Sequence, residues 1–418
     1  MLLAYVLMQL ATAIEVAATG TVSDRGTDIQ QGKSVSPDLV VATSIVHYVE
    51  RTQQSIILNN ASRDQRFAND LYIREHQPQS VLCTPLSNQG RLRGLIYLEN
   101  NLTPHAFTEK RLQVLRLLSS QAAIALDNAR LYTNLADLNK AYARFVPQQL
   151  LQHLNKRNIT EVNLGDNVEL EMTVMFSDIR AFTTIAEKLT PAESFRFLND
   201  YLARLEPVIV QHNGFIDKYI GDAVMALFSD GADDAVKGGI AMQKTLAAYN
   251  RERQDSPYPA IKIGIGINTG RLMLGTVGGK DRMDGTVISD AVNLAARLEH
   301  LTKRYGVDLL ISHHTYTQLR YPQSHCIRKI GTTEIRGKSE IVTIYEVFDA
   351  DDIELRAAKQ AIRDQFDRAL IDYENQDWQA AIQRFQACLK KVPTDPVIQY
   401  YLEQCKGQPN QLSSIEER

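Results

Sequence analysis

Two aspartates occupy positions where carboxylates can hold a metal ion. Asp178 ends the apolar run EMTVMFSD (residues 171–178), which has the pattern of a buried strand. Asp222 follows Gly221 in FIDKYIGDAVMALF (residues 215–228), a predicted β-hairpin with its turn at this Gly-Asp pair. Either aspartate alone is more often a turn or capping residue. As a pair at strand ends they predict a site for two Mg²⁺ or Mn²⁺ ions, because magnesium needs few carboxylates beside phosphate oxygens and water.

The residues that follow Asp178 suit a phosphate group. IRAFTTIAEKL (residues 179–189) is predicted to be a loop that enters a helix. The first amides of a helix are not used by its own hydrogen bonds, and together with the helix dipole they attract anions. A carboxylate followed by such amides is a suitable place for a metal-bound triphosphate.

A third segment, RMDGTVISDAVNLAARLE (residues 282–299), places two polar side chains on one helical face. A strand around residues 285–288 leads to a helix that begins near Asp290. Asn293 and Arg297 are four residues apart and therefore share a face. A solvated surface would explain them, but apolar residues flank both, and buried polar groups need partners. A sugar oxygen and a phosphoryl oxygen would be suitable partners.

The composition is that of a globular protein and limits the partners. Of the 418 residues, 44% are hydrophobic and 23% are charged, with a net charge of -3. Because no basic stripe is present, we expect no nucleic acid, and four widely spaced cysteines fit a reducing, cytoplasmic compartment. The apolar first 20 residues lack the basic start of a signal peptide, and Glu15 interrupts them. We interpret them as two buried strands and expect no membrane span.

A strand pair and a long helix precede the segments described above. Residues 80–86 and 91–100 are predicted strands joined by the turn SNQG. Residues 107–132 are a predicted helix with Thr108 as its N-cap. Apolar residues at heptad spacing favour a parallel coiled coil in a dimer over packing against the domain's own sheet. This seam consists of Leu118, Ala122, Ala125, Ala129 and Tyr132, continued by Leu131, Leu135, Leu138, Tyr142 and Phe145.

Residues 1–130 resemble a GAF domain through this strand pair and the exit helix QAAIALDNARLY. The resemblance implies an α/β sensor domain for a small molecule, and no motif identifies that ligand. Residues 351–410 are predicted amphipathic helices that form a tail. Part of the tail resembles a single tetratricopeptide repeat, through Tyr373, Trp378, Ala381, Phe385 and Pro393.

Residues 169–350 resemble the catalytic domain of class III nucleotidyl cyclases. The resemblance runs through VMFSDIRAFTTIAE, FIDKYIGDAVMALF, IGIGINTG, TVISDAVNLAARLE and IRGKSEIVTIYEV, in that order. RFVPQQLLQHL and LGDNVELEMTV, in a helical linker predicted over residues 131–168, resemble the transducing element before such domains. The resemblance implies an α/β (α+β) protein with a ferredoxin-like catalytic domain. Such domains form head-to-tail homodimers whose active sites are built from both subunits.

The resemblance also implies roles for individual residues. Asp178, Asp222 and the Ile179 carbonyl would hold two Mg²⁺ or Mn²⁺ ions. Asn293 would orient the ribose, and Arg297 would stabilise charge on the transferring phosphoryl group. The remaining matches are the base-selecting pair, Lys218 and Thr286, and the phosphate-binding candidates, which are the backbone of Ala181, Phe182 and Thr183 and the side chains of Arg282, Arg336 and Lys338.

The base-selecting pair favours ATP. Adenine N1 accepts a hydrogen bond and its N6 amine donates one, whereas guanine reverses both edges. The Lys218 ammonium only donates, and the Thr286 hydroxyl can accept. A mismatch with guanine costs about 1–3 kcal/mol. We therefore predict an adenylate cyclase, with a guanylate cyclase and a catalytically silent nucleotide-sensing or dimerisation module as alternatives.

Three residues near the base pocket stand out. Gly285 takes a place where the family often has an aromatic residue, and Ser289 replaces a frequent glycine. Both are expected to loosen the purine pocket or to change the rate. Asp217, next to Lys218, has no role in this interpretation.

Overall fold

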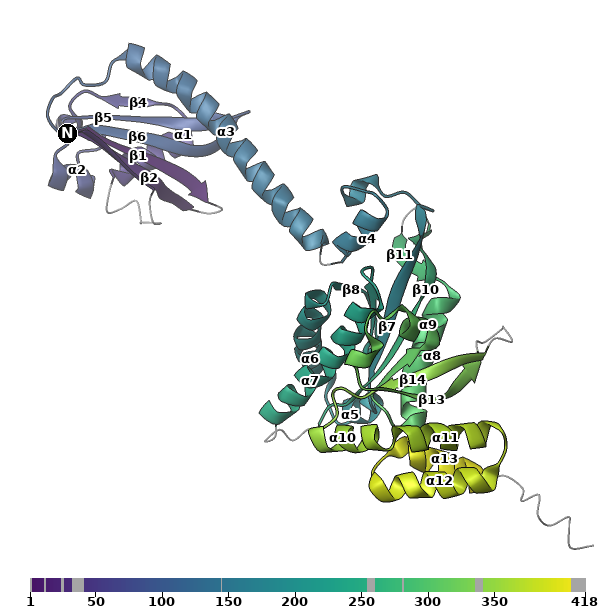
Figure 1. Cartoon of the computed structure of the whole chain (residues 1–418). Helices are drawn as coiled ribbons and strands as arrows, with labels where there is room; N and C mark the ends of the chain where they lie inside the picture. The colour runs from purple at the N-terminus through teal and green to yellow at the C-terminus, as the bar shows by residue number, and fades with distance from the viewer. Residues whose placement is uncertain are drawn as a thin grey trace, which may run out of the picture. The chain divides into compact units, whose positions relative to one another are not determined.

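The computed structural model describes residues 2–10, 13–23, 26–31, 41–143, 145–253, 260–279, 282–334 and 341–406, with side chains from residue 41 onward. The chain divides into two compact units, residues 1–142 and 143–418 (Figure 1). No described helix is both long and apolar enough to cross a membrane.

The first unit is built on a six-stranded antiparallel sheet in the order β3-β2-β1-β6-β5-β4. The apolar N-terminal segment forms two of its strands, as predicted, and the hairpin turns at Gln89-Gly90. Residues of α1, α2 and the central strands form one core, which includes Ile45, Tyr72 and Tyr97. The elements are β1 (Leu2–Leu10), β2 (Ala13–Ser23), β3 (Gly26–Gln31), α1 (Thr43–Thr52), β4 (Ile56–Leu58), α2 (Leu71–His76), β5 (Ser80–Asn88), β6 (Arg91–Asn100) and α3 (Glu109–Tyr142).

Helix α3 presents two different apolar faces. It begins where predicted, since the Thr108 hydroxyl accepts a hydrogen bond from the Arg111 amide at 3.4 Å. One face, which includes Leu112 and Ala123, is buried in the first unit. The predicted heptad seam lies on another face, where Leu118 and Leu135 are exposed. Packing on the domain's own sheet therefore does not account for the seam.

The second unit contains an eight-stranded sheet in the order β13-β14-β12-β10-β7-β9-β8, with β11 paired to β10. The central strands β7 and β10 run antiparallel along their whole paired length, from Ile179 opposite Ile263 to Asn167 opposite Gly275. The strands are β7 (Asn167–Ile179), β8 (Gly214–Ile220), β9 (Ala223–Phe228), β10 (Ile263–Gly278), β11 (Met283–Ile288), β12 (Leu309–Ser312), β13 (Ile327–Glu334) and β14 (Ile341–Val347).

Helices pack around this sheet in separate cores. Helices α6 and α7 pack in the largest core with β7, β9 and β10. Helix α4 packs in another, where Leu150 meets apolar residues of β7, β8, β10 and β11. The helices are α4 (Gln148–His153), α5 (Phe182–Ala186), α6 (Pro191–Gln211), α7 (Ala232–Glu252), α8 (Asp290–Tyr305), α9 (His313–Gln318), α10 (Ile353–Ala361), α11 (Arg363–Glu374), α12 (Trp378–Lys391) and α13 (Pro396–Lys406).

The predicted helical tail is present as α10–α13, and it belongs to the second unit. Its apolar residues share one core with Leu294, Leu298 and Tyr305 of α8. A fully buried ion-pair network fixes it to the sheet edge. Arg328 on β13 contacts Glu346 at 2.6 Å and Asp395, just before α13, at 2.5 Å. The tail thus supports the back of the helix that carries Asn293 and Arg297.

Candidate active site

The predicted metal-binding aspartates lie together at one end of the sheet. Asp178 is near the end of β7, and Asp222 lies in the β8–β9 turn, which Gly221 allows by its left-handed conformation (φ 66°). Pairing of Ser177 with Val224 aligns these two strand ends. Burial, a hydrogen bond to the Asp178 side chain and the charge of that carboxylate raise the pKa of Asp222 to about 6.

The carboxylate pair suits a divalent cation, because two acids this close repel each other unless a cation neutralises them. The Ile179 side chain is buried, and its backbone contacts the Asp222 carboxyl. Among the described residues, no group of three or more His, Cys, Asp or Glu side chains is arranged to hold a metal. Two aspartates and a carbonyl would leave coordination positions for phosphate oxygens and water, as Mg²⁺ prefers.

Lys303 is a component of this site that sequence reasoning missed. Its ammonium lies 3.0 Å from Asp178 Oδ2, and this contact raises the pKa of Lys303. Lys303 lies in the last turn of α8, where basic residues commonly complement the helix dipole. That position gave no signal of a contact with a residue 125 positions earlier in the chain.

Helix α5 begins directly beyond the end of β7, as predicted. Ala181 is its N-cap and adopts a left-handed conformation (φ 54°) that turns the chain from strand to helix. Phe182 is half-buried against the main core, and the Thr183 side chain is exposed. The first helical residues thus follow Asp178 closely, and their role as phosphate ligands stays a prediction.

The structure brings Lys218 and Thr286 together. The Lys218 ammonium on β8 donates to the Thr286 hydroxyl at 3.3 Å and to the Gly285 carbonyl at 3.4 Å, both on β11. The Lys218 side chain is 31% exposed, so the pair lines an accessible but partly desolvated site. The contact places a cationic donor beside a hydroxyl that can also accept, a combination that could read the edge of a base.

Asn293 and Arg297 occupy adjacent turns of α8. Arg297 is half-buried, but Asn293 is exposed, so the expectation that apolar neighbours bury both polar groups is wrong for Asn293. Within the described part of the chain, neither side chain forms a hydrogen bond or an ion pair, so both remain available to a ligand. Helix α8 is capped by Ser289, whose hydroxyl accepts from the Ala291 amide at 3.0 Å and donates to the Arg271 carbonyl.

The three cationic phosphate candidates are only partly described. Arg282 is exposed immediately before β11. Arg336 and Lys338 lie outside the described residues, and their roles stay predictions.

The structure shows why position 285 is a glycine, through a contact that the sequence did not predict. A Cβ atom at this position would lie 2.4 Å from Leu150 Cδ2 of helix α4. Leu150 itself is buried, at 5% exposure. The linker helix therefore fills the space beside Thr286 that a side chain at position 285 would need.

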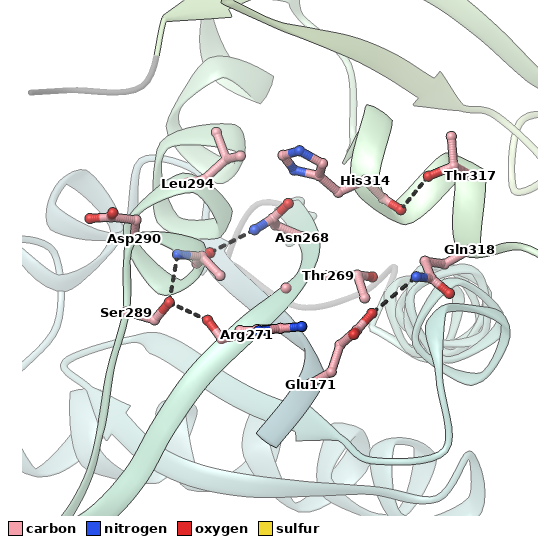
Figure 2. Close-up of a pocket in the computed structure, with 12 residues that line it drawn as sticks. Glu171, Asn268, Thr269, Arg271, Ser289, Asp290, Leu294, His314, Thr317 and Gln318 are labelled. Carbon is pink, nitrogen blue, oxygen red and sulfur yellow. Dashed lines mark hydrogen bonds between the residues drawn. The ribbon is translucent and has the colours of Figure 1, made fainter. Parts of the chain in front are cut away.

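A separate cavity of about 430 Å³ opens beside the N-terminus of α8. Figure 2 shows it between β10, α8 and α9, with Asn268 donating to the Ala291 carbonyl at 2.9 Å and Gln318 donating to Glu171 at 3.0 Å. None of the predicted site residues lines this cavity. It therefore adds no group to the constellation described above.

Comparison with known proteins divides the chain in the same way. Residues 167–347 match the family described as adenylate and guanylate cyclase catalytic domain, and residues 4–126 match the GAF domain family. An adenylate cyclase from Anabaena cylindrica is 44% identical over 213 residues, which cover 50% of this chain and 42% of that protein. The terminal-differentiation-specific adenylate cyclase of Dictyostelium discoideum is 35% identical over 275 residues, 64% of this chain and 13% of that protein.

The solved structures that resemble the chain include the adenylyl cyclase CyaB from P. aeruginosa. It is 35% identical, with a TM-score of 0.40, over 44% of this chain and 96% of that one. The guanylyl cyclase Cya2 is 30% identical, with a TM-score of 0.38, over 44% of this chain and 94% of that one. The chain spans less than half the length of the curated relatives named above.

Proposed function

Because the chain contains a catalytic domain of the adenylate and guanylate cyclase family, at residues 167–347, and a GAF domain, at residues 4–126, we propose that it converts ATP to 3′,5′-cyclic AMP and pyrophosphate. The observation that carries the choice of ATP is the contact between the Lys218 ammonium and the Thr286 hydroxyl. In this arrangement Lys218 donates to adenine N1, and a lone pair of Thr286 accepts from the N6 amine. The N1–H group of guanine is a donor and would face the Lys218 ammonium, which is also a donor. Two opposed donors in a partly buried site would weaken the binding of GTP.

Asp178 and Asp222, with the Ile179 carbonyl, would hold two divalent cations, Mg²⁺ or Mn²⁺. Such ions, when bound, lower the pKa of the ribose 3′-hydroxyl and stabilise negative charge at the reacting phosphate. The closeness of the half-buried Asp222 to Asp178 supports this assignment, because both carboxylates can then face one ion. Binding would also have to displace the Lys303 ammonium from Asp178.

The residues of α8 supply positioning and charge. Asn293 orients the ribose so that its 3′ oxygen lies in line with the α-phosphorus, which is the main requirement of an intramolecular displacement. Arg297 donates to the α-phosphoryl oxygens, where charge increases in the transition state. Its contribution to the rate is expected to be large, since arginines of this kind supply about 10³-fold or more in other phosphoryl transfers.

We place each active site between two copies of the chain. Within one chain, Asp178 contacts Lys303, whereas Lys218 contacts Thr286, and no described contact joins the two groups. A head-to-tail dimer would bring the aspartates of one subunit to the base pocket of the other subunit and to the face of its helix α8 that carries Asn293 and Arg297. The exposed seam on α3 would hold the dimer, and a small molecule in the GAF domain would change the alignment of the two half-sites.

Cyclic nucleotide formation tests the proposal. The purified chain, given ATP or GTP with Mg²⁺ or Mn²⁺, is expected to form cyclic AMP and little cyclic GMP. Asp178→Ala should abolish the product, and Asp230→Ala, which removes an exposed carboxylate beyond the β9 strand, should not. Cyclic GMP as the main product would favour a guanylate cyclase. No product under any of these conditions would favour the catalytically silent module.

A further inference from the structure

Asp217 occupies an irregular position in strand β8. Ile216 pairs with Ala226 and Lys218 pairs with Met225, so Asp217 is the extra residue of a β-bulge. In a regular strand, neighbouring side chains point to opposite faces of the sheet. A bulge re-aims side chains, and bulges are frequent beside active sites. Here the Asp217 and Lys218 side chains come within 3.5 Å of each other.

The Asp217 carboxylate is buried without full compensation. Its side chain is only 4% exposed, and its Oδ2 atom accepts no hydrogen bond from the described residues. Burial raises the pKa of this carboxyl, the charge of Lys218 opposes the shift, and that of Asp284 adds to it. A buried, incompletely satisfied carboxylate costs stability. Its position beside a base-reading residue indicates a functional reason for that cost.

The Lys218 ammonium has three acceptors around it, and none is close. Asp217 Oδ2 lies at 3.5 Å, the Gly285 carbonyl at 3.4 Å and the Thr286 hydroxyl at 3.3 Å. Charge-assisted hydrogen bonds are usually about 2.7–2.9 Å long. The ammonium is therefore held at its place by nearby charge and dipoles and keeps capacity to donate to a ligand.

We propose that Asp217 is the positioning residue that makes Lys218 a selective reader of adenine. This inference rests on the proposed function, because it concerns the base pocket of the same site. Asp217 attracts the ammonium and holds it beside Thr286. A fixed, charged donor favours adenine N1, which accepts, and opposes guanine N1, which donates. Without Asp217, Lys218 loses its fixed position, and discrimination between the two bases falls.

The test is the substitution Asp217→Asn, which keeps the side-chain shape and removes the charge. Affinities for 3′-deoxyATP and 3′-deoxyGTP, measured by calorimetry with Mg²⁺, give base selectivity without turnover. We expect the ATP-to-GTP preference to fall about tenfold, mainly through weaker binding of the adenine nucleotide. The KM for ATP should rise by a similar factor, with a smaller change in kcat. The melting temperature should stay the same or rise, because a buried carboxylate is removed.

Two further variants make the result specific. Asp284→Asn removes an exposed carboxylate near Asp217 that forms no contact with Lys218, and it should leave selectivity unchanged. Asp217→Glu keeps the charge and should restore most of the preference.

An unchanged preference in Asp217→Asn, with intact binding, would overturn this inference but leave the proposed function standing. If the unaltered chain prefers the adenine analogue but forms no cyclic AMP, the proposed function fails while the role of Asp217 can still be measured. A chain that binds neither analogue would overturn both.

Discussion

At the scale of single residues, the acidic pair gives the most direct link between structure and chemistry. Asp178 and Asp222 lie at adjoining strand ends, where burial and the neighbouring Asp178 carboxylate raise the pKa of Asp222 to about 6. A cation that binds between the two carboxylates would reduce the repulsion between them and allow both to be ionised. The pair that we propose to bind metal therefore destabilises the metal-free fold at neutral pH.

The pH dependence of stability follows from this shift. The folded chain holds the Asp222 proton between the ordinary pKa of 3.8 and about 6, whereas the unfolded chain releases it. The free energy of unfolding therefore falls as pH rises through that interval and stays lower above it. Asp222→Asn should make the metal-free protein more stable than the unaltered chain at pH 7.5, with a difference that shrinks toward pH 4.

Thermal unfolding in a chelating buffer at both pH values measures this difference. Asp230→Asn, an exposed substitution, should show no such pH-dependent gain. Metal affinity should weaken as the pH drops below about 6, since the ion must then displace a proton. A gain in stability of Asp222→Asn that is the same at both pH values would contradict the account.

At the scale of elements, helix α8 connects most parts of the second unit. It carries Asn293 and Arg297 on one face, Lys303 at its C-terminal end, and apolar residues that pack against the tail. The buried network of Arg328, Glu346 and Asp395 fixes that tail to the sheet. Loss of the network should therefore shift α8 and, with it, the candidate active-site residues Asn293 and Arg297.

We expect Asp395→Ala to cost about 3–5 kcal/mol of unfolding free energy, because it leaves the Arg328 charge buried without one of its partners. The Arg328 side chain has no exposed surface, and Asp395 also accepts from the Val397 amide at the start of α13. Denaturant unfolding provides the measurement. The matched control is Glu374→Ala, which breaks the partly exposed Lys329–Glu374 pair and should cost at most about 1 kcal/mol. Equal effects of the two substitutions would refute the role of the buried network.

The contact between α4 and β11 gives a second prediction at this scale. Gly285→Ala places a methyl group against Leu150, so the linker helix or the strand that carries Thr286 has to move. We expect a loss of about 1–3 kcal/mol in stability and a raised KM for ATP. Gly279→Ala is the control, because nothing lies within 4 Å of its added Cβ. Comparable kinetics for the two variants would show that α4 does not influence the base pocket.

The elements were largely predictable from the sequence, and the contacts between distant elements were not. The hairpin around Gly221, the strand that ends at Asp178 and the helix that begins at Asp290 follow from local periodicity and turn chemistry. Helix α3 differs from its prediction. It is one continuous helix through Tyr142, whereas the sequence predicted a helix that ends at residue 132 and a separate helical linker. The contacts of Lys303 with Asp178 and of Leu150 with Gly285 depend on long-range packing, which no local pattern encodes.

At the scale of the whole molecule, an active site shared between subunits requires a dimer. Helix α3 exposes Leu131, Leu135 and Leu138, each at least 50% accessible, although these residues are large and apolar. Leu135→Lys combined with Leu138→Lys should weaken dimerisation and lower cyclic AMP formation in proportion to the loss of dimer. Asn139→Lys, on the same helix, is the control. Sedimentation velocity at several protein concentrations measures the effect, and a dimer untouched by the leucine substitutions would count against the seam.

The most direct test of the central claim uses a dimer with two different inactive subunits. One subunit carries Asp178→Ala and the other carries Arg297→Ala, with separate tags that allow the mixed dimer to be purified. If each active site joins the aspartates of one subunit to α8 of the other, the mixed dimer contains one intact site. It should then form cyclic AMP from ATP at about half the rate of the unaltered dimer, while each variant alone is inactive. A mixed dimer as inactive as its parents, beside an active unaltered protein, would contradict the shared site.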